Sequence, residues 1–291
     1  MDAFLRNWRQ DALSKQQYDS AIFIGNKVLA LTNADFDTIA LAQIHFAAGN
    51  YTRALSFVSR EDLIQRSPEC KYLAAHCYVK QNRYEAALTL LGDKNPLNLA
   101  TTTDSARRKL QHIDRQHIPK TLKSRPPERV DRSEERDLED ADKIKYEAGM
   151  CYLRGLCYAK QNAFDKAKEC YKDAVRIDVQ CFEAFDQLTK NFLMSPAEEW
   201  TFLNTLNFDS VSPSGEKNAD TVDFVRNLYI TRLSKYARPE EFAGAIETLS
   251  SHYKLAENAD ILLARAELLF ASSRYQQALE LTSKIVTKDP R

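Results

Sequence analysis

The chain has 291 residues with 41 basic and 41 acidic side chains, so its formal net charge is zero. This balance argues against general binding to nucleic acid or to an anionic membrane, since such surfaces normally show a basic excess. The chain has only 7 glycines and 9 prolines. Strands joined by tight turns need more of both, so we expect long helices with short links.

Several classes of protein and site are not supported by the sequence. No apolar run is long enough to span a bilayer, and the N-terminus lacks the pattern of a secretory signal. The six cysteines form no C-x-x-C pair, so we expect reduced thiols on buried helix faces. No metal-ligand spacing, phosphate-binding loop or serine-nucleophile motif occurs. The sequence therefore predicts no metal, no cofactor, no catalytic residue and no enzyme activity.

An aromatic residue followed three positions later by alanine recurs along the chain. The pairs are Tyr18 with Ala21, Tyr51 with Ala54, Tyr84 with Ala87, Phe164 with Ala167, Phe242 with Ala245, and Tyr275 with Ala278. The first three alanines lie 33 residues apart, as do the last two. This spacing is close to the 34-residue period of tetratricopeptide (TPR) repeats.

The residue types fit the helix pair of such a repeat. The aromatic residue begins the second helix and fills the turn, and the alanine lies where two helices cross closely. Gly155 meets the same need for a small residue on the first helix of its pair, and Tyr158 completes the unit that matches best. The predicted pairs span residues 2–32, 35–65, 68–93, 144–178, 181–208, 220–254 and 259–289.

The predicted fold is all-α, with TPR helix pairs stacked into a right-handed superhelical solenoid. Residues 1–97 hold the first three pairs. Residues 98–143 form a charged insertion, which we expect to be disordered because it has too few apolar residues to bury. Residues 144–291 hold the further pairs, and the chain is expected to be truncated before a next repeat.

The first helix pair is unusually apolar for the end of a stack. Consecutive helical positions point about 100° apart, so the run Ile22–Ile24 cannot all face one neighbour. A terminal repeat normally has a polar outer face. We therefore predict that this pair contacts a partner, although some of its residues could instead belong to the core of the repeat. The predicted interface residues are Phe4, Leu5, Trp8, Ile22 and Phe23.

Two other binding signals are weaker. The positions that hold a Lys and Asn carboxylate clamp in some TPR proteins are occupied by Arg6 and Gln10, Ile39 and Gln43, and Tyr72 and His76. They do not make such a clamp.

Ser67-Pro68 and Ser195-Pro196 are predicted to be N-caps followed by proline at the first helical position. Ser212, in the polar link 209–220, is the candidate phosphorylation site.

Longer runs resemble one family. They are Phe4–Arg6 with Trp8-Arg9, Tyr72–Ala75, Met150–Gly155, Phe164-Asp165 with Ala167–Lys172, Cys181–Leu188, and Glu198–Trp200. Outside the insertion, most of the chain resembles the N-terminal half of the cell-division-cycle-sixteen (cut-nine) type of TPR subunit of the anaphase-promoting complex, in its fungal form.

The resemblance implies a role in mitosis and cell-cycle control. A subunit of this type is a non-catalytic scaffold of a ubiquitin ligase, forms a homodimer and contacts other TPR subunits. In the homodimer the first repeats of each copy are clasped in the groove of the other. The resemblance also implies a location in the nucleus and cytoplasm. The site for a small stabilising subunit would lie in later repeats. The alternative is a monomeric TPR adaptor that binds a linear peptide in its groove.

Overall fold

A computed structural model describes residues 1–96, 131–211 and 219–288, with no side-chain detail for residues 131–142. Throughout these ranges the regular elements are helices, and no strand occurs among them. The chain divides into two compact units, Met1–Ile177 and Asp178–Arg291. The helix pairs that the sequence predicts recur in both units, which confirms the all-α TPR fold class.

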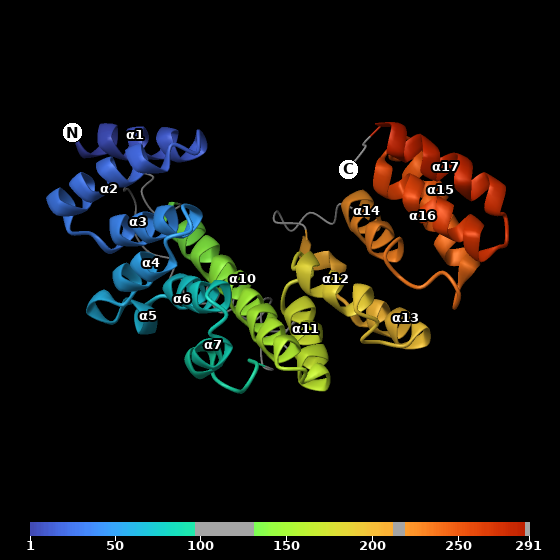
Figure 1. Cartoon of the computed structure of the whole chain (residues 1–291), viewed down its shortest axis with the longest axis horizontal. Coiled ribbons are helices and arrows are strands. Elements are labelled where there is room, and N and C mark those ends of the chain that lie inside the picture. The colour runs from blue at the N-terminus through green and yellow to red at the C-terminus, as the bar shows by residue number, and fades with distance from the viewer. Residues whose placement is uncertain (97–130, 212–218, 289–291) are drawn as a thin grey trace, which may run out of the picture. The chain divides into compact units, whose positions relative to one another are not determined.

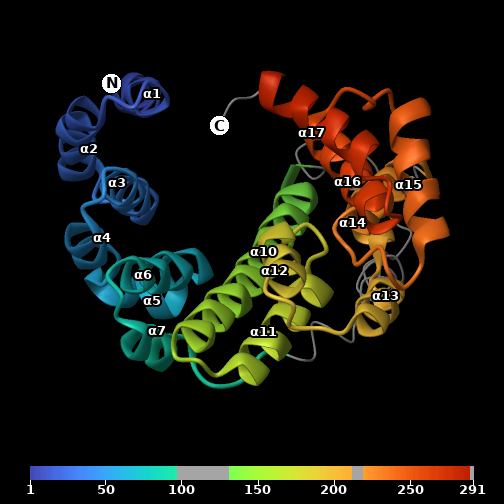
Figure 2. The same ribbon diagram turned by 45° about the vertical axis from the view of Figure 1, so that its right-hand side comes forward.

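In its described residues the first unit contains four helix pairs that follow one another in chain order (Figure 1). Its helices are α1 (Asp2–Ser14), α2 (Tyr18–Thr32), α3 (Asp35–Ala47), α4 (Tyr51–Val58), α5 (Leu63–Arg66), α6 (Pro68–Lys80), α7 (Tyr84–Leu91), α10 (Asp131–Lys160) and α11 (Phe164–Ile177). A short 3-10 turn, Arg60–Asp62, lies between α4 and α5. Within this unit α10 packs against α6, α7 and α11, as Figure 2 shows.

The second unit contains α12 (Phe182–Lys190), α13 (Pro196–Thr205), α14 (Ala219–Ile230), α15 (Pro239–Ser251), α16 (Ala259–Ala271) and α17 (Tyr275–Lys288). A 3-10 turn, Phe208–Val211, precedes α14. Tyr229 lies at the centre of an aromatic cluster with Phe182, Phe185 and Phe208. Its hydroxyl donates a hydrogen bond to the carbonyl oxygen of Val179.

The small residues of the repeat lie at close helix crossings. All six signature alanines are buried (Ala21, Ala54, Ala87, Ala167, Ala245 and Ala278). A methyl group added at Gly155 would lie 2.5 Å from Cε1 of Tyr171, which is itself fully buried. Tyr158, from the same helix, is half-buried and lies beneath Lys166, whose Nζ is 5.4 Å from the ring centroid. The opening aromatic residues vary more, since Phe242 is buried while Phe164 and Tyr275 are exposed.

Two boundaries differ from those that the sequence predicted. Helix α10 begins at Asp131, so the backbone of residues 131–143, expected in the disordered insertion, is helical. These residues are mostly good helix formers, and extending an existing helix adds one hydrogen bond per residue. The compact units also divide after Ile177 rather than at the insertion, because α10 packs on α6 and α7. Residues 98–130 of the insertion lie outside the described residues.

Candidate functional site: the first helix pair

The N-terminal helix α1 exposes two aromatic rings. The side chains of Phe4 and Trp8 are one turn apart, and their ring centroids are separated by 6.2 Å. Phe4 is 66% exposed and Trp8 is 46% exposed. Large apolar side chains that are exposed side by side are typical of a surface that another protein covers. Phe4 and Trp8 are called the α1 aromatic pair below.

The other three predicted interface residues do not share this surface. Ile22 packs partly against the small core cluster of Ala12, Ala21 and Ile44, and Leu5 is half-buried. Phe23 is 59% exposed, with Nζ of Lys27 at 4.7 Å from its ring centroid. It lies on the face of α2 opposite the buried residues of that helix. The first pair therefore has two separate exposed apolar surfaces, one on α1 and one on α2.

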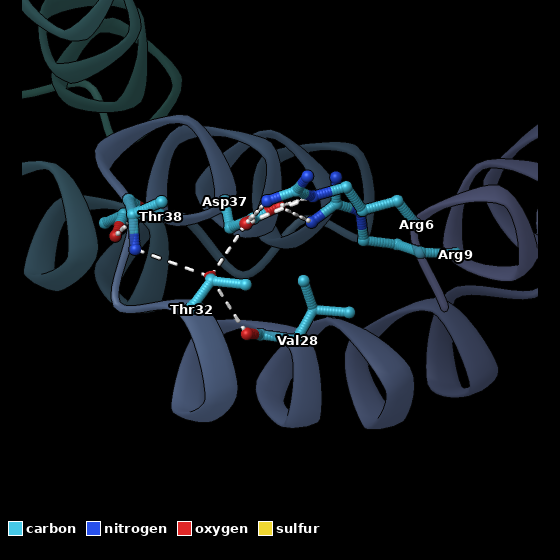
Figure 3. A network of polar contacts seen from close by, with 7 residues as sticks. Arg6, Arg9, Val28, Thr32, Asp37 and Thr38 are labelled. Atoms are coloured by element: carbon cyan, nitrogen blue, oxygen red, sulfur yellow. Dashed lines mark hydrogen bonds and ion pairs between the residues drawn. The ribbon is translucent and has the colours of Figure 1, made fainter. Parts of the chain in front are cut away.

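A buried ionic cluster joins α1, α2 and α3 (Figure 3). Asp37, the third residue of α3, is 0% exposed. Arg6 donates to its carboxylate from Nη2 (2.7 Å) and Nε (3.1 Å), and Arg9 donates from Nη1 (2.9 Å). The hydroxyl of Thr32, at the end of α2, donates to the same carboxylate at 2.8 Å. These four residues are called the Asp37 cluster.

The Asp37 carboxylate remains ionised despite its burial. Burial alone raises the pKa of the carboxyl group, because the charged form loses its water. Hydrogen bonds from Arg6, Thr32 and Arg9 lower it by more in total, so the pKa of Asp37 falls to about 2. Its position in the first turn of α3 also suits a negative charge. At neutral pH the cluster is therefore a fixed ionic contact.

A second group of aromatic side chains runs along the first helices of successive pairs. Phe46 on α3 contacts His76 on α6 with centroids 4.8 Å apart, and Tyr72 on α6 contacts Tyr146 on α10 at 5.8 Å. Tyr72 and His76 are themselves 5.7 Å apart. All four side chains are half-buried. Repeat stacks form an extended concave surface, and these four residues of successive first helices are called the groove stripe.

The expected absence of a carboxylate clamp agrees with the contacts at those positions. Arg6 is held by Asp37, and Gln43 donates to the carboxylate of Glu69 at 2.6 Å. His76 lies within the groove stripe. Burial, together with the smaller effect of the Lys80 charge, lowers the pKa of His76 to about 4. This histidine is therefore neutral at physiological pH and does not supply a positive charge for a carboxylate.

The other predicted site residues are placed as follows. Ser67 accepts a hydrogen bond from the backbone N–H of Cys70, and Ser195 accepts one from that of Glu198. The structure thus confirms both serine N-caps, each followed by proline at the start of its helix. Ser212 lies outside the described residues, so its phosphorylation stays a prediction.

Reactive chemistry is not evident in the described ranges. Five of the six cysteines are buried, and burial raises the pKa of the Cys77 and Cys151 thiols to about 12. Such thiols stay protonated and are poor nucleophiles at neutral pH. Among the described residues no group of three or more His, Cys, Asp or Glu side chains could hold a metal ion. No helix in these ranges is both long and apolar enough to cross a membrane.

The Asp37 cluster is not predictable from the sequence pattern. Arg6 and Arg9 are spaced three apart on one helix, so both guanidinium groups can reach the same neighbour, but this spacing does not name the partner. Their shared partner, Asp37, lies 31 residues after Arg6 and 28 residues after Arg9. Only the folded arrangement of the first three helices brings these residues together.

Comparisons with known proteins agree with the arrangement of helix pairs. The family model described as anaphase-promoting complex, cyclosome, subunit 3 matches residues 14–94, and a tetratricopeptide repeat model matches residues 148–180. The chain is 39% identical to the anaphase-promoting complex subunit cut9 of Schizosaccharomyces pombe, a match covering 99% of this chain and 37% of cut9. It is 30% identical to the subunit CDC16 of Saccharomyces cerevisiae, a match covering 98% of this chain and 31% of CDC16.

A solved structure shows the same fold. It is described as the APC/C hetero-tetramer Cut9–Hcn1 and matches with a TM-score of 0.78 and 37% identity. The match covers 100% of this chain and 47% of the matched chain. The chain therefore spans less than half the length of these relatives.

Proposed function

We propose that this chain, which belongs to the cut9 and CDC16 family of anaphase-promoting complex subunits, is a non-catalytic scaffold. It self-associates through its first helix pair. It would act in the nucleus and cytoplasm, in a ubiquitin ligase of the cell cycle, and would also contact other TPR subunits. Catalysis would belong to other subunits. The protonated thiols of Cys77 and Cys151 are consistent with a protein that carries no nucleophile.

The observation that carries this proposal is the exposure of the α1 aromatic pair. Aromatic side chains that become fully buried supply much of the binding energy of protein interfaces. Phe4 and Trp8 are 66% and 46% exposed, so both have substantial apolar area to bury. A single helix that presents two rings one turn apart is suited to insertion into a groove lined by apolar side chains.

The groove stripe is the surface that such a helix would meet. Phe46, Tyr72, His76 and Tyr146 come from three successive first helices and are half-buried. In a two-fold dimer each copy contributes both surfaces. Helix α1 of the first copy then lies in the groove of the second copy, and α1 of the second copy lies in the groove of the first. The related structure is described as a hetero-tetramer of Cut9 and Hcn1. Four chains of two kinds must include at least two copies of one kind, which supports self-association.

Light scattering coupled to size exclusion tests the proposal. We expect the native chain to have a mass near twice 33.3 kDa, and we expect a Phe4→Ala, Trp8→Ala variant to lose this dimer. The matched control is Phe270→Ala with Tyr275→Ala, which removes another exposed pair of touching rings, in the second unit. This control should remain dimeric.

A folded native monomer would overturn the proposal and favour the peptide-binding adaptor. In that case the groove stripe would be free to accept a linear peptide. Loss of the dimer in the control variant as well would instead place the contact surface outside the first helix pair.

A further inference from the structure

Helix α1 fully buries few of its side chains. Its buried residues are Arg9 and Ala12, and the latter carries a single methyl group. The helix packs mainly against α2. Its two arginines instead reach Asp37 on α3, as Figure 3 shows. Beside the apolar cluster that Ala12 shares with Ile44 of α3, the polar contacts of Arg6 and Arg9 are therefore the directional link between α1 and the next repeat.

The geometry of this link is restrictive. Arg6 and Arg9 are three positions apart, and both guanidinium groups donate to one carboxylate. Guanidinium groups bind carboxylates in a planar, directional manner, so two of them on one acceptor limit both rotation and sliding of the helix. The acceptor is itself held by the Thr32 hydroxyl at 2.8 Å, and the carbonyl oxygen of Val28, 3.0 Å from the same hydroxyl, competes for its single hydrogen.

The α1 aromatic pair depends on the same rotation. Phe4 and Trp8 flank Arg6 in the sequence, and Trp8 directly precedes Arg9. Successive side chains on a helix point about 100° apart, so rotation of the arginines away from Asp37 would carry both rings with them.

We propose that Asp37 is a positioning residue for self-association: by holding Arg6 and Arg9 it fixes α1 in the orientation that presents Phe4 and Trp8 to a second copy of this chain. The inference rests on the proposed function. Buried ion pairs are often replaceable by apolar side chains with little loss of stability, and their best-attested use is to specify one arrangement. An ionic cluster is thus suited to define the orientation of a helix that fully buries only Arg9 and Ala12.

The test compares Asp37→Asn with Asp35→Asn. Asp35 lies on the same helix and pairs with Arg66 at 3.0 Å on the surface, so its substitution makes the same change of charge without touching α1. We expect Asp37→Asn to raise the dissociation constant of the dimer by about tenfold or more, measured by sedimentation over a dilution series. Asp35→Asn should leave it unchanged.

Amide hydrogen exchange provides a readout that does not require dimerisation. At concentrations where the protein is monomeric, Asp37→Asn should speed exchange in residues 2–14 and leave α6 and α10 unchanged. If the native chain never dimerises, the proposed function fails, but exchange of α1 still decides whether Asp37 fixes this helix. Unchanged exchange in residues 2–14 would overturn the inference.

An apolar replacement separates positioning from stability. In the triple variant Arg6→Met, Arg9→Met, Asp37→Leu, the thermal midpoint should recover relative to Asp37→Asn while dimer affinity stays low. Recovery of both together would show that the cluster only stabilises the fold, and would overturn the inference.

Discussion

Among the described glycines, Gly155 leaves the least room for a side chain, because the Tyr171 ring lies against it. A methyl group at Gly155 would approach Cε1 and Cδ1 of the Tyr171 ring at 2.5 and 2.6 Å. The ring is fully buried between α10 and α11 and cannot move aside without displacing its neighbours. The close approach explains why this first-helix position is glycine here, whereas Ala42, Ala75 and Ala266 hold it in three other pairs.

We predict that Gly155→Ala lowers the free energy of unfolding by about 1–3 kcal/mol, because overpacking forces side chains off their preferred rotamers. Urea unfolding followed by circular dichroism would measure the change. Gly244 is the matched control, since it lies within α15 with no atom within 4 Å of an added methyl group. Alanine there should be neutral or stabilising, by up to about 1 kcal/mol. Equal destabilisation by both substitutions would contradict the packing explanation.

His76 should make stability depend on pH. Its pKa is about 4 in the folded chain, because of burial and the charge of Lys80, and about 6.5 when unfolded. Between these values the unfolded chain binds the proton more readily, so the free energy of unfolding should fall as pH drops from about 6.5 to about 4. Asp37 does not contribute in this range, since its folded pKa of about 2 places its effect below pH 4.

Urea midpoints measured at pH 7 and pH 5 would show the effect of His76. The His76→Gln variant should have a smaller difference between the two midpoints than the native chain. His45 also has a lowered pKa through burial, so some dependence should remain. An undiminished difference in the variant would show that His76 is not a source of the pH dependence.

At the scale of the helix pair, a single residue in the turn sets the direction of the second helix. The residue two positions before the second helix has a positive φ in five pairs: Gln16, Gly49, Asn82, Asn162 and Ser273. This left-handed conformation favours glycine and asparagine and costs other residues energy. The turn is therefore built by backbone geometry, and its sequence can vary at a modest cost in stability.

Gly49 tests this interpretation of the turn. Its φ is +79°, and an added methyl group would meet no atom within 4 Å. Gly49→Ala should therefore destabilise the chain through backbone strain alone, by about 1–2 kcal/mol. Gly49→Asn should cost less, because asparagine tolerates this conformation better. A thermal melt of both variants would measure the difference, and equal stability of the two would contradict the explanation.

Part of the helical pattern could be predicted from residues that mark the start of a helix. Ser67-Pro68 and Ser195-Pro196 mark the starts of α6 and α13 in the sequence itself, and the structure places caps there. The extension of α10 to Asp131 could not be predicted in this way. Residues 131–143 have no apolar period, and their helix continues one that is anchored by packing farther along the chain.

The candidate site could be predicted only in part, for a similar reason. The apolar character of the first pair is visible in the sequence, but the separation of Phe23 from the α1 aromatic pair depends on which face of each helix is buried. The choice of Asp37 as the partner of Arg6 and Arg9 depends on contacts across about thirty residues, which the sequence pattern alone does not specify.

At the scale of the whole molecule, the proposed dimer requires that each copy supply both an α1 helix and a groove. Two variants can separate these contributions: Phe4→Ala with Trp8→Ala removes the α1 aromatic pair, and His76→Ala removes one residue of the groove stripe. A dimer of either variant alone has a defect in both of its equivalent contacts. A mixed dimer keeps one contact with intact residues on both sides.

The most direct measurement is therefore the mass distribution of the two variants, alone and mixed, by sedimentation, with circular dichroism to confirm that each is folded. We predict that each variant alone is largely monomeric and that the equimolar mixture forms dimers containing one chain of each kind. A mixture that dimerises no better than the separate variants would contradict the claim that α1 of each copy occupies the groove of the other.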